Sequence, residues 1–539
     1  MICSKIPLRK HTNLSTKRAE MAYDYIIIGS GSAGAIIASR LSESHKNSVL
    51  LIESGPGYTS IDQTPNEVKY GFGANRNRSW FFTNPDHGRT FIGKSTELRE
   101  PILVPRGKTL GGSSAVNAQI FLRGEPDDYD EWANSGNDLW SFQECLPYFR
   151  KLENDLDFSG DFHGQSGPVR CIRTPKNEWQ KDSIAFYDGF RDLGYPHVDD
   201  HNDPDSTGVG PLPFNTINRI RQNTWITYLE PYLDRGNLTI LSNAQVQKII
   251  LDNLQAKGVI VNTESGLETI EGNEIIVSAG AINSPQILML SGIGPDNMLS
   301  DQGIETLLHH PNVGKNLRDH PQVPLTWQVQ KGQESDPDLR GVDVAIRYTA
   351  KGSDLRNDML IHHTSFGMGS KLYFGDTTNM FGRVGMIVAI YLAKGKGELS
   401  LRTSDPSIQP NINYNFFKET EDLRRMRDAV RMCVDVAAGS SYKHLIDFRL
   451  APTEEILNSD TQLNIWLKEN ARTSHHISGT CKMGPESDPT SVVDQYGNVH
   501  GIKNLKVADA SIMPDCPRAN TNVPTMMIGE KIADLIKNS

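Results

Sequence analysis

The sequence predicts a two-domain α/β protein, with a parallel sheet in one domain and an antiparallel sheet flanked by helices in the other. Three observations lead to this prediction. Residues 23–54 read as strand, helix and strand, and residues 274–294 read as a further strand that runs into a helix. Residues 320–415 instead carry alternating apolar stretches, such as 383–391 and 397–402, which are typical of antiparallel strands.

The first strand–helix–strand unit contains a glycine turn. Gly29, Gly31 and Gly34 stand at G-x-G-x-x-G spacing where the apolar strand becomes a helix. Gly29 allows the tight turn, Gly31 lets backbone N–H groups approach a pyrophosphate, and Gly34 lets the helix pack closely. Glu53 ends the second strand, where an acid accepts hydrogen bonds from ribose hydroxyls. With the strand before it, the helix after it and the acid in place, we predict that this turn binds a dinucleotide; the alternative is a glycine-rich turn that binds nothing. The spacing alone does not choose FAD over NAD.

A second small-residue turn follows at Gly111, Gly112, Ser113 and Ser114, ahead of an apolar segment. Its free N–H groups could face phosphates or a flavin, although a helix-capping turn explains the same pattern. Short strands from Leu238 onward predict a β-meander that leads into the strand–helix junction at 274–294.

In that junction the sequence predicts a helix with Ser284 as N-cap, Pro285 as its first residue and Gly292 as its stop. Two adjacent histidines, His475 and His476, lie in a Ser/Gly/Thr-rich loop near the end of the chain. No third ligand stands at metal spacing, so we predict no metal site, and a single histidine without context is most often structural.

Composition and charge limit the kinds of partner that this protein is expected to bind. Lys and Arg number 55 against 65 Asp and Glu, a formal charge of −10, which lacks the basic excess of a nucleic-acid-binding surface. The six cysteines are scattered singly, as in a reducing compartment, so a cytoplasmic location is expected. The longest apolar run, 384–393, is about half a membrane span, so no transmembrane segment is predicted and peripheral membrane contact stays open.

Residues 1–20 are basic, with no apolar core of a signal peptide. We expect these residues to be a disordered tail or a start of the sequence that is placed too far upstream, and an organelle-targeting segment is the alternative. Whether the mature protein contains residues 1–20 is left open.

Together these motifs resemble the glucose-methanol-choline family of FAD oxidoreductases, and most closely its choline-dehydrogenase-like and alcohol-dehydrogenase-like members. Four stretches match in the family's order: 29–34 with Glu53, 107–124, 280–294, and 476–484 followed by 509–525. The resemblance implies FAD and a Rossmann-like FAD-binding domain made of discontinuous segments. The implied boundaries are a tail at 1–20, an FAD-binding domain at 21–315 and a substrate-binding domain at 316–471. The FAD-binding domain is interrupted by cap or substrate segments at about 55–100 and 150–225, and it is completed by residues 472–539.

The resemblance also assigns the catalytic residues. His476 holds the place of the family's catalytic histidine, and Asn522 the place of its partner before a Pro-Thr pair. A neutral imidazole can take the hydroxyl proton while the carbinol hydride leaves, and an asparagine can hold the same oxygen. His475 stands where relatives often place an aromatic residue, so we expect it to be a wall residue.

Further residues are implied as cofactor contacts. These are Gly29, Ser30, Gly31, Ser32, Ala33, Gly34, Glu53, Leu110, Gly112, Ser113, Asn117, Val246, Asp509, Ala510, Pro524 and Thr525. Some members tether FAD through a histidine directly before the asparagine that matches Asn117; here that place is Val116, which has no nucleophilic atom, so we predict a non-covalent flavin.

The predicted function is FAD-dependent oxidation of an alcohol CH–OH group to an aldehyde or ketone, by hydride transfer to flavin N5 with His476 as general base. The electron acceptor is left open: the enzyme is either an oxidase that uses O2 or a dehydrogenase that passes electrons to a quinone or another carrier. Two further alternatives are a non-redox lyase of the same fold (hydroxynitrile-lyase-like) and a flavin-binding protein without turnover. Residues 362–386 slightly favour a neutral, partly apolar alcohol, and the sequence leaves the particular alcohol and the oligomeric state open.

Overall fold

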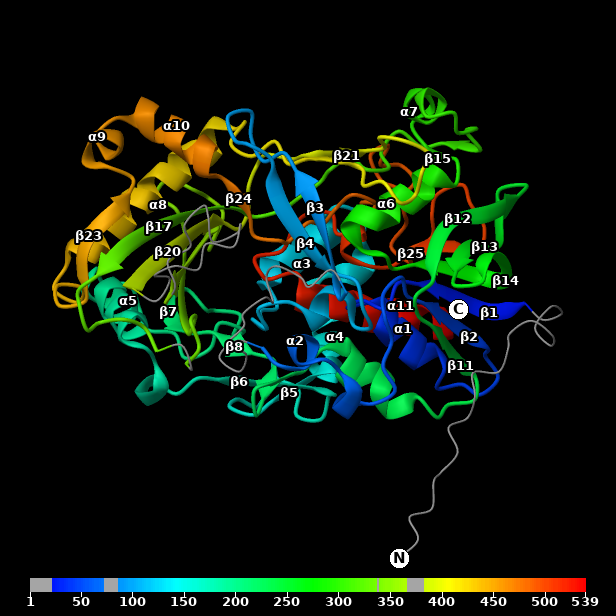
Figure 1. Ribbon diagram of the computed structural model, residues 1–539, viewed down its shortest axis with the longest axis horizontal. Helices are drawn as coiled ribbons and strands as arrows, with labels where there is room; N and C mark the ends of the chain where they lie inside the picture. Colours follow the sequence, from blue (N-terminus) through cyan, green and yellow to red (C-terminus); the bar gives the residue numbers. More distant parts are fainter. Residues whose placement is uncertain (1–21, 72–85, 337–338, 366–381) are drawn as a thin grey trace, which may run out of the picture.

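The computed structural model describes residues 22–71, 86–336, 339–365 and 382–539. Two seven-stranded sheets organise these residues, one on each side of a central region that contains the hairpin of β3 (Gly88–Gly93) and β4 (Ile102–Gly107) (Figure 1). The predicted fold class, α/β with one parallel and one antiparallel sheet, is confirmed. The N-terminal residues 1–20, which were predicted to be a tail, lie outside the described residues.

The first sheet has a parallel centre. Strand β1 (Tyr23–Ile28) lies between β2 (Val49–Ile52) and β14 (Gly266–Val277), and β11 (Leu238–Leu241) and β25 (Leu505–Val507) extend the parallel pairing on either side. Strand β2 and the last three residues of β1 and of β14 are apolar and buried, as expected for a sheet covered on both faces. Their carboxyl ends meet along one edge, which is where ligands bind in such sheets.

The predicted meander completes this sheet. Strands β12 (Gln245–Asp252) and β13 (Gln255–Thr263) pair antiparallel with each other, and β13 pairs antiparallel with the first half of β14. The long strand β14 therefore belongs to the meander at its start and to the parallel sheet at its end, which carries the chain to the edge where helix α6 begins.

Helix α6 (Gly280–Leu290) begins four residues before the predicted N-cap Ser284, so that prediction is wrong. The Ser284 hydroxyl donates to the Asp509 carboxylate within the first turns of the helix, and Pro285 lies inside the helix. Proline has no N–H for the carbonyl of Ala281, and the Thr480 hydroxyl donates to that carbonyl at 2.7 Å instead. A side chain from a distant loop thus allows the helix to start early.

Helices α1 (Gly34–Leu41) and α11 (Asn522–Lys537) pack against each other under the edge of the first sheet, and α4 (Phe142–Leu152) packs against α11. The approach is close: a Cβ on Gly529 of α11 would lie 2.9 Å from the carbonyl oxygen of Ala33. The last helix of the chain therefore lies beside the first helix (Figure 1).

The second sheet is antiparallel. Strand β17 (Pro321–Val329) pairs with β20 (Arg383–Ile390), and β19 (Met359–Thr364), β18 (Val344–Tyr348) and β7 (Gly208–Pro211) follow in that order. On its other side β17 pairs with β23 (Ile446–Ala451) and β24 (Arg472–Thr473). Helices α5 (Lys181–Asp192), α8 (Thr420–Ala438) and α10 (Asp460–Asn470) pack on it (Figure 1).

Of the two stretches that were predicted to form strands of this sheet, one does so and the other pairs elsewhere. The stretch 383–391 is β20, as predicted, whereas 397–402 contributes β21 (Glu398–Ser400) to a separate two-stranded sheet with β22 (Asn411–Asn413). The antiparallel sheet also takes β7 and β24 from outside the predicted range 316–471.

The remaining elements are short connections. They are α2 (Asn66–Lys69), α3 (Pro126–Asn134), α7 (Asp296–Asp301), α9 (Glu454–Leu457), β5 (Glu153–Asp155), β6 (Val169–Arg173), β8 (Pro213–Phe214), β9 (Thr216–Ile217), β10 (Ile220–Arg221), β15 (Ile293–Gly294) and β16 (Leu308–His309). Among the helices that the structure describes, none combines the length and the apolar character needed to cross a bilayer.

Candidate active site

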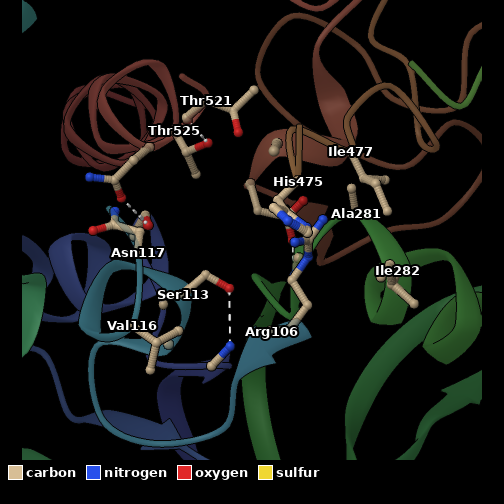
Figure 2. A pocket seen from close by; sticks show the side chains of 18 of the residues that line it. Arg106, Ser113, Val116, Asn117, Ala281, Ile282, His475, Ile477, Thr521 and Thr525 are labelled. Atoms are coloured by element: carbon tan, nitrogen blue, oxygen red, sulfur yellow. Dashed lines mark hydrogen bonds between the residues drawn. The ribbon is translucent and has the colours of Figure 1, made fainter. Parts of the chain in front are cut away.

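A cavity of about 690 Å³ lies between the two sheets. Its walls include Glu53 and Val246 from the first sheet, Leu360 and Ile387 from the second, and His476 from the C-terminal loop. Figure 2 looks into it, with Thr521 and Thr525 of the α11 segment on one side and Ala281 and Ile282 of α6 on the other. Segments from both ends of the chain therefore form one cavity.

The glycine turn between β1 and α1 has the geometry that its spacing predicts. Gly29 has φ of +98°, which L side chains rarely adopt, and a Cβ on Gly34 would lie 2.0 Å from the carbonyl oxygen of Gly29. A Cβ on Gly31, in contrast, would meet no protein atom within 4 Å, although Gly31 lines the cavity. The space next to Gly31 is open to a ligand that approaches the backbone closely.

Glu53 lies at the carboxyl end of β2 and is 5% exposed. One carboxylate oxygen accepts from the backbone N–H of Ser30 at 3.1 Å and from its hydroxyl at 2.7 Å. The other accepts from the N–H of Gly55 at 2.9 Å. These donors fix the carboxylate at the cavity wall. The oxygen that faces Ser30 already accepts two hydrogen bonds, so a ribose hydroxyl would be accepted by the other oxygen, in place of the long contact of 3.3 Å from the Ser54 hydroxyl.

The turn at 111–114 lies against the glycine turn. Gly112 has φ of +51°, and a Cβ there would lie 2.7 Å from the Cα of Gly31. Ser113, Val116 and Asn117 face the cavity together (Figure 2). The two small-residue turns, which are about 80 residues apart in the chain, thus form one continuous piece of wall.

His476 is 8% exposed and lies at the opposite part of the cavity, beside Asn520. The buried carboxylate of Asp319 holds its loop: one oxygen accepts from the N–H of His476 at 3.0 Å and from the N–H of His320 at 2.7 Å. His475 has φ of +67° in this loop. The anchor on Asp319 fixes His320 and His476 next to each other.

The hydrogen bonds of His476 determine its tautomer. Nε2 lies 3.0 Å from the amide nitrogen of Asn520, and Nδ1 lies 2.9 Å from Nδ1 of His320. Because the amide nitrogen donates, Nε2 is the acceptor, and a neutral ring then carries its proton on Nδ1 and donates it to His320. The ring of His320 is held by stacking on Tyr391, with ring centroids 4.0 Å apart.

Burial keeps these histidines uncharged. Burial lowers the pKa of His476 well below its usual value, and the neighbouring His320 lowers it further. Burial lowers the pKa of His320 and of His475 to about 3 each. His476 is therefore a neutral base, and its one lone pair, on Nε2, accepts from Asn520 on the side of the cavity.

The structure corrects the prediction that Asn522 is the partner of His476. Asn520, two residues earlier, makes the hydrogen bond to His476, and Asn522 instead accepts from the Ser32 hydroxyl at 2.8 Å. The physical reason is the start of α11: Asn522 is its first residue and points along the glycine turn, while Asn520 lies in the preceding loop beside the histidines. Both asparagines line the cavity.

Most of the predicted site residues lie on the cavity wall. These are Gly29, Gly31, Ser32, Ala33, Glu53, Gly112, Ser113, Asn117, Val246, His476, Asp509, Ala510, Asn522 and Thr525. Four do not: the Ser30 hydroxyl turns to Glu53, Gly34 packs under Gly29, and Leu110 and Pro524 are buried in the surrounding packing. These four support the wall from behind.

Asp509 reaches the cavity with its carboxylate already occupied. One oxygen accepts from the N–H of Gly280 at 2.8 Å and from the hydroxyl of Ser284, and the other accepts from the N–H of Ser511 at 2.7 Å. Asp509 therefore joins the C-terminal segment to the start of α6, and its contribution to a ligand is to shape the loop.

Sequence reasoning missed Asn520, His320 and Tyr391. Asn520 stands in A-N-T-N-V-P-T, where either asparagine could be the partner and only the helix start distinguishes them. His320 directly precedes β17 and Tyr391 directly follows β20, with no local motif around them.

Glu153, Asp155 and His163 also lie close enough together to hold a metal ion. Their charges are already compensated: Arg123 pairs with Glu153, and Arg173 pairs with Asp155 at 2.9 Å. Burial lowers the pKa of His163, but hydrogen bonds to the carboxylates outweigh it and raise the pKa to about 10. A protonated His163 and two arginines make this a buried ion-pair cluster.

The cavity fits a dinucleotide. The N–H groups at the start of α11 open onto it, beside the two glycine-rich turns, and such ends of helices bind anionic groups. The amide nitrogen of Asn522 is buried and has no hydrogen-bond acceptor among the described residues. A buried donor without a partner is costly, so a ligand acceptor at this position would satisfy it.

Comparison with known proteins agrees with this geometry. Residues 23–322 match the N-terminal model of the GMC oxidoreductases, and residues 393–529 match the C-terminal model. The chain is 33% identical to an oxygen-dependent choline dehydrogenase of Photobacterium profundum over 540 residues, which cover 95% of this chain and 93% of the relative. It is 32% identical to the enzyme of that name from Vibrio vulnificus, over 95% of this chain and 94% of the relative.

A solved structure has the same fold. Pyridoxine 4-oxidase from Mesorbium loti superposes with a TM-score of 0.88 at 25% identity, over 96% of this chain and 99% of that chain. Formate oxidase superposes with a TM-score of 0.85 at 24% identity. With both family models matched and relatives at this identity over nearly its whole length, the chain belongs to the GMC (glucose-methanol-choline) oxidoreductase family.

Proposed function

We propose that this protein oxidises the CH–OH group of an alcohol to an aldehyde or ketone, with FAD as the hydride acceptor and His476 as the general base. The observation that carries the proposal is the pair of His476 and Asn520, 3.0 Å apart, in the same cavity as Glu53 and the glycine turn. A base and a dinucleotide site that share one cavity are what hydride transfer from an alcohol requires.

His476 would take the hydroxyl proton. Its neutral state supports this role because the lowered pKa leaves Nε2 unprotonated at physiological pH, so that a substrate hydroxyl could take the place of the Asn520 N–H there. Its Nδ1–H donates to His320, so the ring cannot rotate without breaking that bond, and Asp319 holds both residues through their backbones. The lone pair therefore stays aimed at the cavity.

Asn520 would position the substrate oxygen. Its amide nitrogen is at His476 in the structure, and its side-chain oxygen is buried with no hydrogen-bond donor among the described residues. A substrate hydroxyl placed between the two side chains could hydrogen-bond to both. Asn522 and the start of α11 would face the cofactor instead.

FAD, when bound, supplies the hydride acceptor at flavin N5. Glu53 would hold its ribose hydroxyls, the backbone at Gly31 and Gly112 would face its pyrophosphate, and the buried amide of Asn522 would donate to it. Val116 faces the cavity where some relatives carry the tethering histidine, and its isopropyl group cannot form the bond.

We therefore expect FAD to be bound without a covalent link. Acid precipitation of the holoenzyme should release yellow flavin into the supernatant and leave a colourless pellet, because only non-covalent contacts hold the cofactor. A yellow pellet, together with a peptide whose mass is raised by that of FAD, would contradict this and identify the attachment residue. Free FAD carried through the same precipitation with bovine serum albumin controls for trapping in the pellet.

Anaerobic mixing of the yellow holoenzyme with a panel of primary and secondary alcohols tests the proposed activity. We expect the flavin absorbance near 450 nm to bleach with at least one alcohol and the corresponding carbonyl product to form in a 1:1 ratio to reduced flavin. Bleaching excludes a non-redox lyase and a flavin carrier without turnover, whereas no bleaching with any alcohol would contradict the proposal. Admission of air afterwards distinguishes the acceptors: rapid reoxidation indicates O2, and slow reoxidation indicates a quinone or another carrier.

A further inference from the structure

The part of the cavity next to His476, where the proposed alcohol would bind, is called the substrate end here, and its wall is apolar. Besides the main core, the structure contains a second, smaller hydrophobic cluster. Seven of its members also line the cavity: Ile120, Leu122, Leu212, Val342, Leu360, Ala389 and Tyr391. They come from the segment after the second glycine-rich turn and from the antiparallel sheet, on the side of His476. The substrate end is therefore a gap in a hydrophobic cluster.

The polar residues of this part of the wall are uncharged. Gln322 lies opposite Ala389 in the β17–β20 pair, and its amide is occupied. Its oxygen accepts from the Ser474 hydroxyl at 3.0 Å and its nitrogen donates to the carbonyl of Thr473 at 3.1 Å. Burial lowers the pKa of His362 to about 4, so this ring is also neutral at physiological pH.

The carboxylates on the described cavity wall lie at the cofactor end, beside the glycine turn and the start of α6. Of the described residues that line the cavity, Glu53 and Asp509 are the acidic ones, and both are hydrogen-bonded to backbone N–H groups of the first sheet's loops. Asp319 is close to His476 but does not line the cavity, and its oxygens accept from three donors of its own loops. No carboxylate in the described part of the wall therefore faces the substrate end.

A positively charged side chain lies on the cavity wall beside the histidines. Arg106 lies on the cavity wall beside His475 (Figure 2), and its charge contributes to the lowered pKa of both His475 and His476. A cationic substrate would thus enter an apolar pocket that has an arginine near it. Transfer of an unpaired charge into such a site is strongly unfavourable, whereas an apolar substituent is favoured there.

We infer that the substrate is an alcohol whose substituent is uncharged and apolar, and that this pocket discriminates against a quaternary ammonium group. The inference rests on the proposed function, since it names the substrate class of the same site. It separates this chain from the two dehydrogenases to which it is similar, whose names state choline as their substrate. Recognition of such a cation uses aromatic faces and negative charge; in the described part of the wall, one face of the Tyr391 ring is occupied by stacking on His320.

Two alcohols of equal shape test this directly. Choline and 3,3-dimethylbutan-1-ol differ in one atom, a charged nitrogen against a neutral carbon, so their comparison isolates the charge. In anaerobic rapid mixing with the holoenzyme, we expect the neutral alcohol to reduce the flavin with a second-order rate constant at least ~100-fold above that of choline. Equal rates, or faster reduction by choline, would overturn the inference.

Failure of the proposed function gives a different result. If neither alcohol reduces the flavin, both are titrated into the oxidised holoenzyme and the shift of the flavin absorbance bands is used to measure binding. Tighter binding of the neutral alcohol then supports the substrate class although the oxidation is wrong. Tighter binding of choline, or no binding of either, overturns it.

A charge introduced into the wall provides an independent test. Gln322→Glu adds one negative charge at nearly constant volume, so above the pKa of the new carboxyl we expect the preference for the neutral alcohol to narrow by about 10-fold. Gln328→Glu on the same strand is the matched control, because it makes the same change of charge outside the cavity wall. If a Gln322→Glu variant that retains FAD shows the same preference for the neutral alcohol as the wild type, the substituent of the alcohol lies elsewhere and the assignment is overturned. If that variant loses FAD, the comparison of the two alcohols in the wild type decides alone.

Discussion

Replacement of His476 by alanine is expected to leave FAD bound and to slow anaerobic flavin reduction by a factor of about 10² to 10⁴. The variant removes the lone pair on Nε2 that faces the cavity, while the backbone N–H of residue 476 can still bind Asp319. The effect should appear in the rate of reduction at saturating alcohol, because the missing group acts on the proton and not on the cofactor. Rapid-reaction absorbance measures this rate.

Two neighbouring variants serve as controls. Asn520→Ala should slow reduction less than His476→Ala, because it removes a positioning hydrogen bond and leaves the base in place. His475→Ala changes a wall residue whose loop anchor is a backbone contact, so it should alter the rate least. A His476→Ala variant that is reduced at nearly the wild-type rate would refute the assignment of the base, and a larger loss in His475→Ala would transfer the role to that residue.

Replacement of Gly34 by alanine is expected to destabilise the FAD-binding domain and to impair its binding of FAD. The new Cβ would lie 2.0 Å from the carbonyl oxygen of Gly29, a backbone atom inside a turn that is packed against Ser278. Overpacking of this kind costs about 1 to 3 kcal/mol, and here the strain falls on the turn that carries the ligand. We expect a lower melting temperature and a protein that is purified without flavin.

Gly31→Ala is the matched comparison, since it adds the same methyl group three residues earlier in the same turn. Its Cβ would meet no protein atom within 4 Å and would occupy space in the cavity. The apoprotein should therefore melt like the wild-type apoprotein, while the affinity for FAD falls by about 10- to 200-fold. Equal loss of thermal stability in the two variants would show that the open space at Gly31 does not serve a ligand.

Local motifs predicted well where the geometry depends on few residues. The spacing of Gly29, Gly31 and Gly34 predicted the turn, and the strand that ends at Glu53 predicted the acid on the cavity wall. Each of these depends on backbone conformations and strand order within one short unit, which the residue pattern specifies directly.

Features that depend on distant residues were missed or misplaced. The start of α6 requires the Thr480 hydroxyl, about 200 residues away, to replace the hydrogen bond that Pro285 cannot make. The partner of His476 is Asn520 and not Asn522 because α11 begins at Asn522, and His320 becomes its neighbour only through the second sheet. No pattern within a single segment contains these relations.

The strand order of the first sheet also has a consequence for the synthesis of the chain. Strand β1 ends at Ile28, but its neighbour β14 ends at Val277, and β25 follows only at 505–507. At about 5 to 20 residues per second, some 250 residues of translation leave one edge of an apolar strand unpaired for roughly 12 to 50 s. Helix α11, which supplies Asn522 and covers α1, is the last element to leave the ribosome. The nascent chain therefore exposes the unpaired edge of β1 until β14 has been made, and then the edge of β14 until β25 has been made.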